Sequence, residues 1–196
     1  MPASNEFHYP PDSLELRSLE QWTEWLLANH KESTGVFLIL AKKSTGEGLD
    51  YQELLNIALC FGWIDAIRKS ATAGTYLQRF TPRGKRSIWS KINRDKAIAL
   101  IEGGRMQRAG LAEVERAKAD GRWDAAYGGQ RSMEVPADLA AAFKKNKKAR
   151  AFFETLDSRN RYAVLFRLHS AKKAETRAKR LATFMDMLEN GRKLYP

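Results

Sequence analysis

Two short runs of alternating character, separated by five small residues, restrict the fold more than any other feature of this chain. The runs are Trp63–Lys69 and Thr75–Thr81, and Ser70–Gly74 connects them. Alternation with a period of two places successive side chains on opposite faces of a strand, and a short connection that contains glycine allows two strands to pair antiparallel. Pro82 has no backbone donor and is expected to end the pairing. The segment therefore predicts a β-hairpin, and with it a fold that contains a sheet.

Helical patterns flank this hairpin. Two capping-box patterns, Ser18 with Gln21 and Asp50 with Glu53, open helices predicted over residues 18–29 and 50–61. Between them, Val36–Leu40 is short, apolar and partly β-branched, as expected of a buried strand. Two more helices are predicted after the hairpin, one from Ser87 or Ser90 to about residue 101 and one over about 110–119.

Beyond residue 128 the chain has only helical patterns. The stretch 128–132 is predicted to separate an α+β domain (1–127) from a basic helical subdomain (128–196). Helices are expected around 136–143, 149–156, 159–170 and 174–188, with the run 144–150 in a loop. The last helix has an apolar stripe of Ala174, Ala178, Leu181, Phe184, Met185 and Leu188. The predicted fold class is α+β: a small antiparallel sheet with helices, followed by an all-helical C-terminal subdomain.

Basic residues gather in two parts of the chain. The net charge is +11 over 196 residues, and residues 128–196 alone hold 16 Lys and Arg against 7 Asp and Glu. Residues 66–96 hold nine basic residues against one acid, Asp95, while the remainder is mildly acidic. Such islands favour anionic partners, although excess charge also keeps a protein soluble.

The residues present disfavour several kinds of site. The chain has no glycine-rich phosphate loop, no serine-nucleophile elbow and no paired-histidine zinc motif. No Cys, His and acid set has metal-ligand spacing, so neither a metal nor a cofactor is predicted. The single cysteine, Cys60, cannot form an internal disulfide. Residues 1–16 lack an export-signal pattern and no apolar run is long enough for a membrane span, so a cytoplasmic location is expected.

Five stretches of the chain carry a family pattern: ALCFGWIDAIRKS, YLQRFTPRGKRSIWSKINRDKA, GLAEVERAKADGRWDAAY, RAFFETLDSRNRYAVLFRLHSAKKAETRAKR and LENGRKLYP. Together and in this order they resemble the YdeI/OmpD-associated (bacteriocin-protection) family, from about residue 20 to the end. The sequence departs from the family pattern at Ala71–Ala73, where an acid is usual, and at Lys147 and Ala174, where proline is usual.

This resemblance implies a role in protection against bacteriocins and cationic peptides, and an association with an outer-membrane porin. It supplies no catalytic residues. A direct protective role is opposed by the charge of +11, because a protein so basic repels cationic peptides.

The segment Trp63–Arg94 concentrates groups that suit an anion. Serine hydroxyls at an expected helix start lie among arginines that can bind an oxyanion with two hydrogen bonds, and tryptophans can stack on a base or sugar. Alternatively, the tryptophans belong to the core, the serines only cap the helix and the arginines are solvated. The residues of the predicted anion or ligand site are Trp63, Arg79, Arg83, Arg86, Ser87, Trp89, Ser90 and Asn93.

Two further sets of residues are weaker candidates. Asp65 either pairs with Arg79 or Arg68 across the hairpin or acts as a general base in a cleft, which makes it the one catalytic candidate. The nucleic-acid candidates are Lys144, Lys145, Lys147, Lys148, Arg177 and Arg180, although such basic faces are often only solvated.

Three functions therefore stay open, and whether the protein is an enzyme stays open with them. The first is a non-enzymatic module that binds an anionic partner, including nucleic acid. The second is an enzyme or sensor for a small phosphorylated or carboxylated ligand. The third is a stress or resistance factor that acts through a protein partner.

Overall fold

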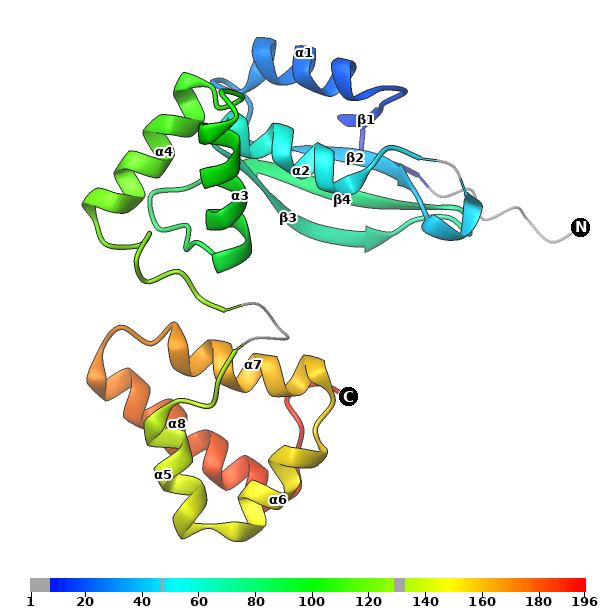
Figure 1. Cartoon of the computed structure of the whole chain (residues 1–196). Coiled ribbons are helices and arrows are strands. Elements are labelled where there is room, and N and C mark those ends of the chain that lie inside the picture. Colours follow the sequence, from blue (N-terminus) through cyan, green and yellow to red (C-terminus); the bar gives the residue numbers. More distant parts are fainter. Residues whose placement is uncertain (1–7, 47, 129–132) are drawn as a thin grey trace, which may run out of the picture. The chain divides into compact units, whose positions relative to one another are not determined.

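The computed structural model describes residues 8–46, 48–128 and 133–196, and the chain divides into two compact units (Figure 1). Unit 1 comprises the described residues up to Trp89 together with Asn93–Ala125, and unit 2 comprises Ser90–Ile92 and the described residues from Ala126 onward. The fold is α+β, as predicted: a four-stranded sheet with helices is followed by C-terminal helices. The domain boundary expected after residue 127 stays a prediction, and residues 129–132 lie outside the described residues.

The sheet of unit 1 has the strand order β1-β2-β4-β3. The predicted hairpin is confirmed as β3 (Trp63–Ser70) and β4 (Thr75–Pro82), which pair antiparallel, and the predicted buried strand is β2 (Val36–Ala41), antiparallel to β4. The edge strand β1 (Ser13–Glu15) runs parallel to β2 and was not predicted, because three residues are too few to show alternation.

Two helices lie on one face of this sheet (Figure 1). They are α1 (Leu19–Asn29) and α2 (Tyr51–Cys60), and the predicted N-caps are confirmed, since Ser18 accepts from the Gln21 amide and Asp50 from the Gln52 amide. The reciprocal bonds of the two capping boxes are absent among the described contacts. The Gln21 side chain accepts instead from the Arg17 amide, and the Glu53 carboxylate accepts from Asn56 and Arg105.

The core of unit 1 forms where these helices meet the sheet. Residues paired across two strands have side chains on the same face of the sheet. Val36 therefore shares a face with its partner Phe80, and Leu38 shares that face with its partner Gln78. The largest side chains buried between helices and sheet are Trp22, Leu26, Leu38, Leu54, Trp63 and Phe80. Burying side chains of this size is the main source of stability in a domain of about a hundred residues.

Two further helices complete unit 1. They are α3 (Lys91–Glu102) and α4 (Arg108–Ala119). Helix α3 begins directly after Ser90, so of the two expected helix starts Ser90 is confirmed and Ser87 is wrong. Ser87 closes a turn of the preceding loop, where its amide donates to the Gly84 carbonyl. Helix α4 crosses the carboxyl end of α2, and the Gln107 amide donates to the Cys60 carbonyl there.

Unit 2 is built from α5 (Ala137–Lys145), α6 (Lys147–Thr155), α7 (Ser158–His169) and α8 (Ala174–Glu189). Its core contains Leu139, Phe143, Phe153, Val164, Leu168, Phe184 and Leu188. Two expectations are wrong here. The basic run 144–150 is helical, with Asn146 capping α6, rather than a loop. Ala174 and Ala178 are exposed, so only the later part of the predicted α8 stripe faces the core.

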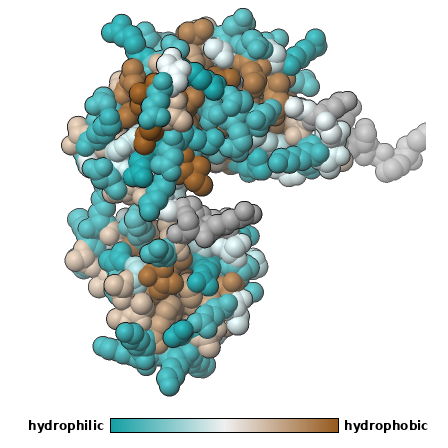
Figure 2. Space-filling view, in the orientation of Figure 1, coloured by the Kyte–Doolittle hydropathy of each residue, from teal (hydrophilic) through white to brown (hydrophobic). Residues whose placement is uncertain are grey.

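On the visible face of each unit, hydrophilic residues surround smaller areas of hydrophobic residues (Figure 2). Within the described ranges, no helix is both long enough and apolar enough to cross a membrane.

Candidate functional site

The two tryptophans of the predicted anion site lie in separate buried clusters. Trp63 is 1% exposed, donates to the His30 carbonyl and contacts Trp22 edge-on. Trp89 is 2% exposed and contacts Trp123, with the ring centroids 4.9 Å apart. Neither ring has a face that a base or sugar can cover, so the expectation that they stack on a ligand is wrong and the alternative, that both belong to the core, holds.

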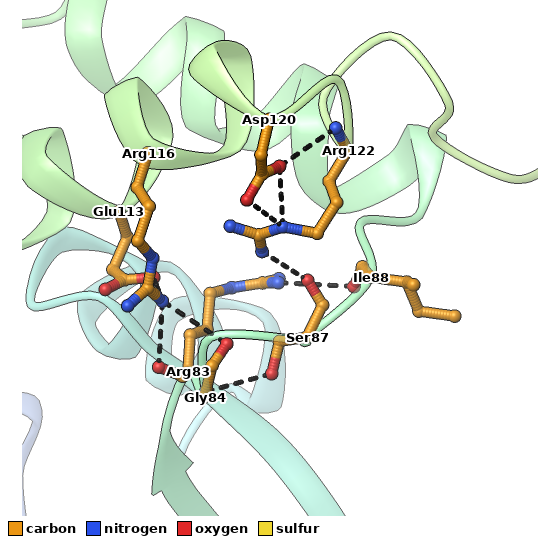
Figure 3. Close-up of polar contacts among 8 residues, drawn as sticks. All are labelled: Arg83, Gly84, Ser87, Ile88, Glu113, Arg116, Asp120 and Arg122. Carbon is orange, nitrogen blue, oxygen red and sulfur yellow. Dashed lines mark hydrogen bonds and ion pairs between the residues drawn. The ribbon is translucent and has the colours of Figure 1, made fainter.

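Arginines from two parts of the chain hold the loop from Arg83 to Ile88 in place (Figure 3). The Arg83 guanidinium lies over the Trp89 ring, 3.6 Å from its centroid, and donates to the Ile88 carbonyl. Arg116 of α4 donates to the Arg83 and Gly84 carbonyls, and Arg122 donates to the Ser87 carbonyl at 2.6 Å. These contacts with loop carbonyls give the three arginines a structural role.

Carboxylates accompany this arginine cluster. Arg122, only 5% exposed, donates from Nε to both oxygens of Asp120, and Arg116 pairs with Glu113. Burial raises the pKa of Glu113, although the charges of the nearby arginines act in the opposite direction. The two carboxylates offset most of the charge of the three arginines, so the cluster has little net positive charge with which to attract an anionic ligand.

The described contacts of the other predicted residues do not converge on one point. Arg79 extends over the Phe37 ring on the sheet face opposite Phe80, while Arg86 is exposed in the loop. The Ser87 hydroxyl accepts from the Gly84 amide, and Ser90 forms a β-bridge with Tyr127. Asn93 lies in the first turn of α3. The structure therefore does not gather the predicted set around one point.

Asp65 has a partner that the sequence did not indicate. Its carboxylate accepts a 2.5 Å hydrogen bond from the Tyr51 hydroxyl, and no ion pair joins it to Arg68 or Arg79 among the described contacts. A β-bulge between Asp65 and Arg68 interrupts the pairing with β4. Burial is the larger cause of a raised pKa of Tyr51, and the hydrogen bond to Asp65 is the second cause.

A pocket of about 900 Å³ opens beside this pair, between the 3₁₀ turn η1 (Lys43–Thr45), the start of α2 and the ends of β3 and β4. We call it the Arg68 pocket. Among its described lining residues the only acid is Asp50, whose carboxylate already caps α2. The cations and aromatic rings that line it are Lys42, Lys43, Arg68, Lys69, Tyr51 and Tyr76.

Arg68 is held between aromatic rings in this pocket. Its guanidinium carbon lies 4.2 Å from the centroid of the Tyr76 ring and 5.4 Å from that of Tyr51. Nε donates to the Gln78 side chain at 3.4 Å, and no described residue accepts from the two Nη groups. Arg68 is exposed, and these contacts orient its planar guanidinium so that the Nη edge is available for bidentate binding of a carboxylate or phosphate.

The other pocket cations differ in how available they are. Lys42 donates to the Thr72 carbonyl, and the Lys69 ammonium lies over the Phe37 ring. Lys43 is exposed. Sequence reasoning missed this site because its cations and aromatic rings come mainly from four elements, η1, α2, β3 and β4. The one available signal was the aromatic and basic character of residues 68, 69 and 76 at the hairpin end.

The nucleic-acid candidates of unit 2 fall into two groups. The four lysines of the run 144–148 are exposed. Arg177 instead donates to both oxygens of Asp138 and to the Leu168 carbonyl, and Arg180 donates to the Arg167 carbonyl. Within the described part of the chain, no three His, Cys, Asp or Glu side chains lie together as a metal site.

Comparison with protein families gives two matches. Residues 14–113, about half of the chain, match a domain of unknown function, DUF8412. Residues 132–191 match the family described as bacteriocin-protection, YdeI or OmpD-associated, a shorter span than the resemblance from about residue 20 implied. No curated protein matches, and neither does any solved structure.

Proposed function

The chain belongs to the family of the domain of unknown function DUF8412 and ends in a YdeI/OmpD-associated region, and we propose that this member is a non-enzymatic module that binds a small anionic ligand in the Arg68 pocket. The ligand class is a phosphorylated or carboxylated compound. The observation that carries the proposal is the guanidinium of Arg68, fixed between Tyr51 and Tyr76, with two Nη groups that no described residue engages.

Charge and shape support this assignment over the predicted site around Arg83 and Trp89. There the buried arginines bind loop carbonyls and carboxylates, whereas the Arg68 pocket combines cations with open volume. Pockets that bind small ligands typically measure several hundred Å³ and combine apolar walls with a few fixed polar groups. The Tyr76 ring supplies apolar surface, and Lys43 adds an exposed charge.

Replacing Arg68 with alanine is expected to weaken the binding of inorganic pyrophosphate at least tenfold. The change removes a charged, bidentate donor, and hydrogen bonds to charged groups contribute about 1.5–3 kcal/mol. Arg68→Lys keeps the positive charge but loses the two parallel guanidinium donors, so its affinity for pyrophosphate is expected to lie between those of the wild type and Arg68→Ala. Isothermal titration calorimetry at low salt measures all three affinities, and the melting temperature of each variant verifies folding.

The matched control is Arg86→Ala, which removes an exposed arginine of the same unit from the site predicted by sequence. Its affinity for pyrophosphate is expected to stay within twofold of the wild type. If Arg86→Ala loses binding while Arg68→Ala retains it, the ligand binds at the loop and the pocket assignment is wrong. If all three variants bind pyrophosphate as tightly as the wild type, neither the Arg68 pocket nor the loop is the binding site.

A further inference from the structure

Two depressions on unit 2 share one residue, Arg167 of α7. One, of about 430 Å³, is lined by Arg159, Tyr162, Ala163, Phe166, Arg167 and Tyr195. The other, of about 460 Å³, continues from Arg167 to Ser170 and to α8, where Thr176, Lys179, Arg180 and Thr183 line it. Their described lining includes four cations and no acid. We call this continuous region the α7 surface.

Aromatic rings occupy one end of the α7 surface. Tyr162 and Phe166, one helical turn apart, stack with centroids 5.5 Å apart and planes 28° from parallel. The Tyr195 ring lies nearby under the Arg159 guanidinium, 4.4 Å from its centroid, and Arg167 donates to the Tyr195 hydroxyl. All three rings are partly exposed. This end therefore offers flat apolar surface beside positive charge.

Cations and hydroxyls occupy the other end. Arg180 donates to the Arg167 carbonyl and to the Ser170 hydroxyl, which fixes its guanidinium against the end of α7. Lys179 is exposed one position earlier. No acid is among the described residues that line either depression, and three acids elsewhere in unit 2, Asp138, Glu154 and Asp186, pair with Arg177, Arg150 and Arg192. The Thr183 hydroxyl already donates to the Lys179 carbonyl, whereas a hydroxyl such as that of Thr176 can donate to a phosphate oxygen.

We infer that the α7 surface binds single-stranded nucleic acid, a function separate from the small-ligand pocket of unit 1. The phosphates lie along Arg167, Lys179 and Arg180, and a base stacks on the ring of Tyr162, which rests on Phe166, itself in contact with Tyr127. Stacked rings beside a cationic groove are the arrangement by which proteins bind single strands without strong sequence preference. A duplex fits less well, because its bases are already stacked on one another.

The test uses the full chain and a fluorescein-labelled 15-nucleotide oligo(dT), followed by fluorescence anisotropy at several salt concentrations. The double variant Arg167→Ala with Lys179→Ala is expected to bind at least tenfold more weakly than the wild type. Its plot of log affinity against log salt should be shallower by about 1.4, since each phosphate contact on a single strand contributes about 0.7.

The matched control removes the same charge from another part of unit 2. Lys144→Ala with Lys148→Ala takes two exposed lysines from α5 and α6 and should change affinity less than threefold. A loss as large as that of the α7 variant would show that only total charge matters and would overturn the inference. The absence of wild-type binding to oligo(dT) at low salt would overturn it as well.

A third variant separates base stacking from charge. Tyr162→Leu keeps an apolar side chain without a flat ring, and it should weaken oligo(dT) binding about tenfold, because stacking of one base is worth roughly that factor. Binding of heparin, a polyanion without bases, should be unchanged. If heparin and oligo(dT) lose affinity equally, or if duplex DNA binds as tightly as oligo(dT), the surface is a general polyanion site and the inference is wrong.

Discussion

Replacing Gly110 with alanine is expected to lower the free energy of unfolding of unit 1 by about 3 kcal/mol. Gly110 is buried on α4 where this helix crosses the carboxyl end of α2. A Cβ atom added there would lie 2.3 Å from the Cys60 carbonyl oxygen and 2.4 Å from the Met106 sulfur. The methionine can move, but the Cys60 carbonyl belongs to the α2 backbone, so the two helices must separate.

Urea unfolding followed by circular dichroism measures this loss. The control is Gly84→Ala, because a Cβ at Gly84 meets nothing nearer than the Ser87 hydroxyl at 3.9 Å. We expect that variant to stay within about 1 kcal/mol of the wild type, as substitutions away from the core usually do. Equal stability of the Gly110 variant and the wild type would contradict the close helix crossing.

Replacing Arg122 with alanine is expected to destabilise unit 1 by about 2–4 kcal/mol. The change removes the donor to the Ser87 carbonyl and both side-chain bonds to Asp120, and it leaves a gap where a side chain only 5% exposed had been. The loop from Arg83 to Ile88 then loses one of its attachments to the region after α4. Chemical denaturation gives the free energy, and susceptibility of the loop to trypsin should rise.

Arg86→Ala serves as the comparison here because Arg86 belongs to the same loop and is exposed. Its stability is expected to stay within about 0.5 kcal/mol of the wild type. A loss for Arg86→Ala as large as that for Arg122→Ala would mean that charge in the loop, rather than the buried bonds of Arg122, sets its stability.

The elements of this fold were predictable where the local pattern decides the structure. The β3–β4 hairpin follows from alternation, and the starts of α1 and α2 follow from the hydroxyl of Ser18 and the carboxylate of Asp50. Strand β1 and the β-bulge between Asp65 and Arg68 were not predictable, because they depend on pairing with distant residues. The sequence predicts a loop for the run 144–150, because nothing local shows that Asn146 both ends α5 and caps α6.

The candidate site was harder to predict because clustering in sequence differs from clustering in space. Arg83 and Trp89 are close in sequence and do meet, but they meet inside the structure, where their partners Arg116 and Trp123 come from more than 25 residues away. The Arg68 pocket needs Tyr51 from α2 and Lys43 from η1 as well as the hairpin. No single stretch of sequence contains that combination.

The family description suggests a resistance role, which stays a prediction for this chain. A module that binds a small anion through unit 1 and a single strand through unit 2 is compatible with a protein whose net charge is +11, whereas direct capture of cationic peptides is not. Action through a protein partner and catalysis that involves Asp65 also stay untested.

The most direct test of the central claim is a titration of the ¹⁵N-labelled protein with inorganic pyrophosphate, followed by amide chemical shifts in NMR spectra. The Arg68 pocket predicts saturable shifts at Gly46, Gln52, Arg68 and Ser70, which line it or adjoin it, with a single dissociation constant. The amides of Gly84 and Ser87 should remain unchanged, because they donate within the loop. Saturable shifts at Gly84 and Ser87 without shifts at Arg68, or no saturable shift anywhere, would contradict the account.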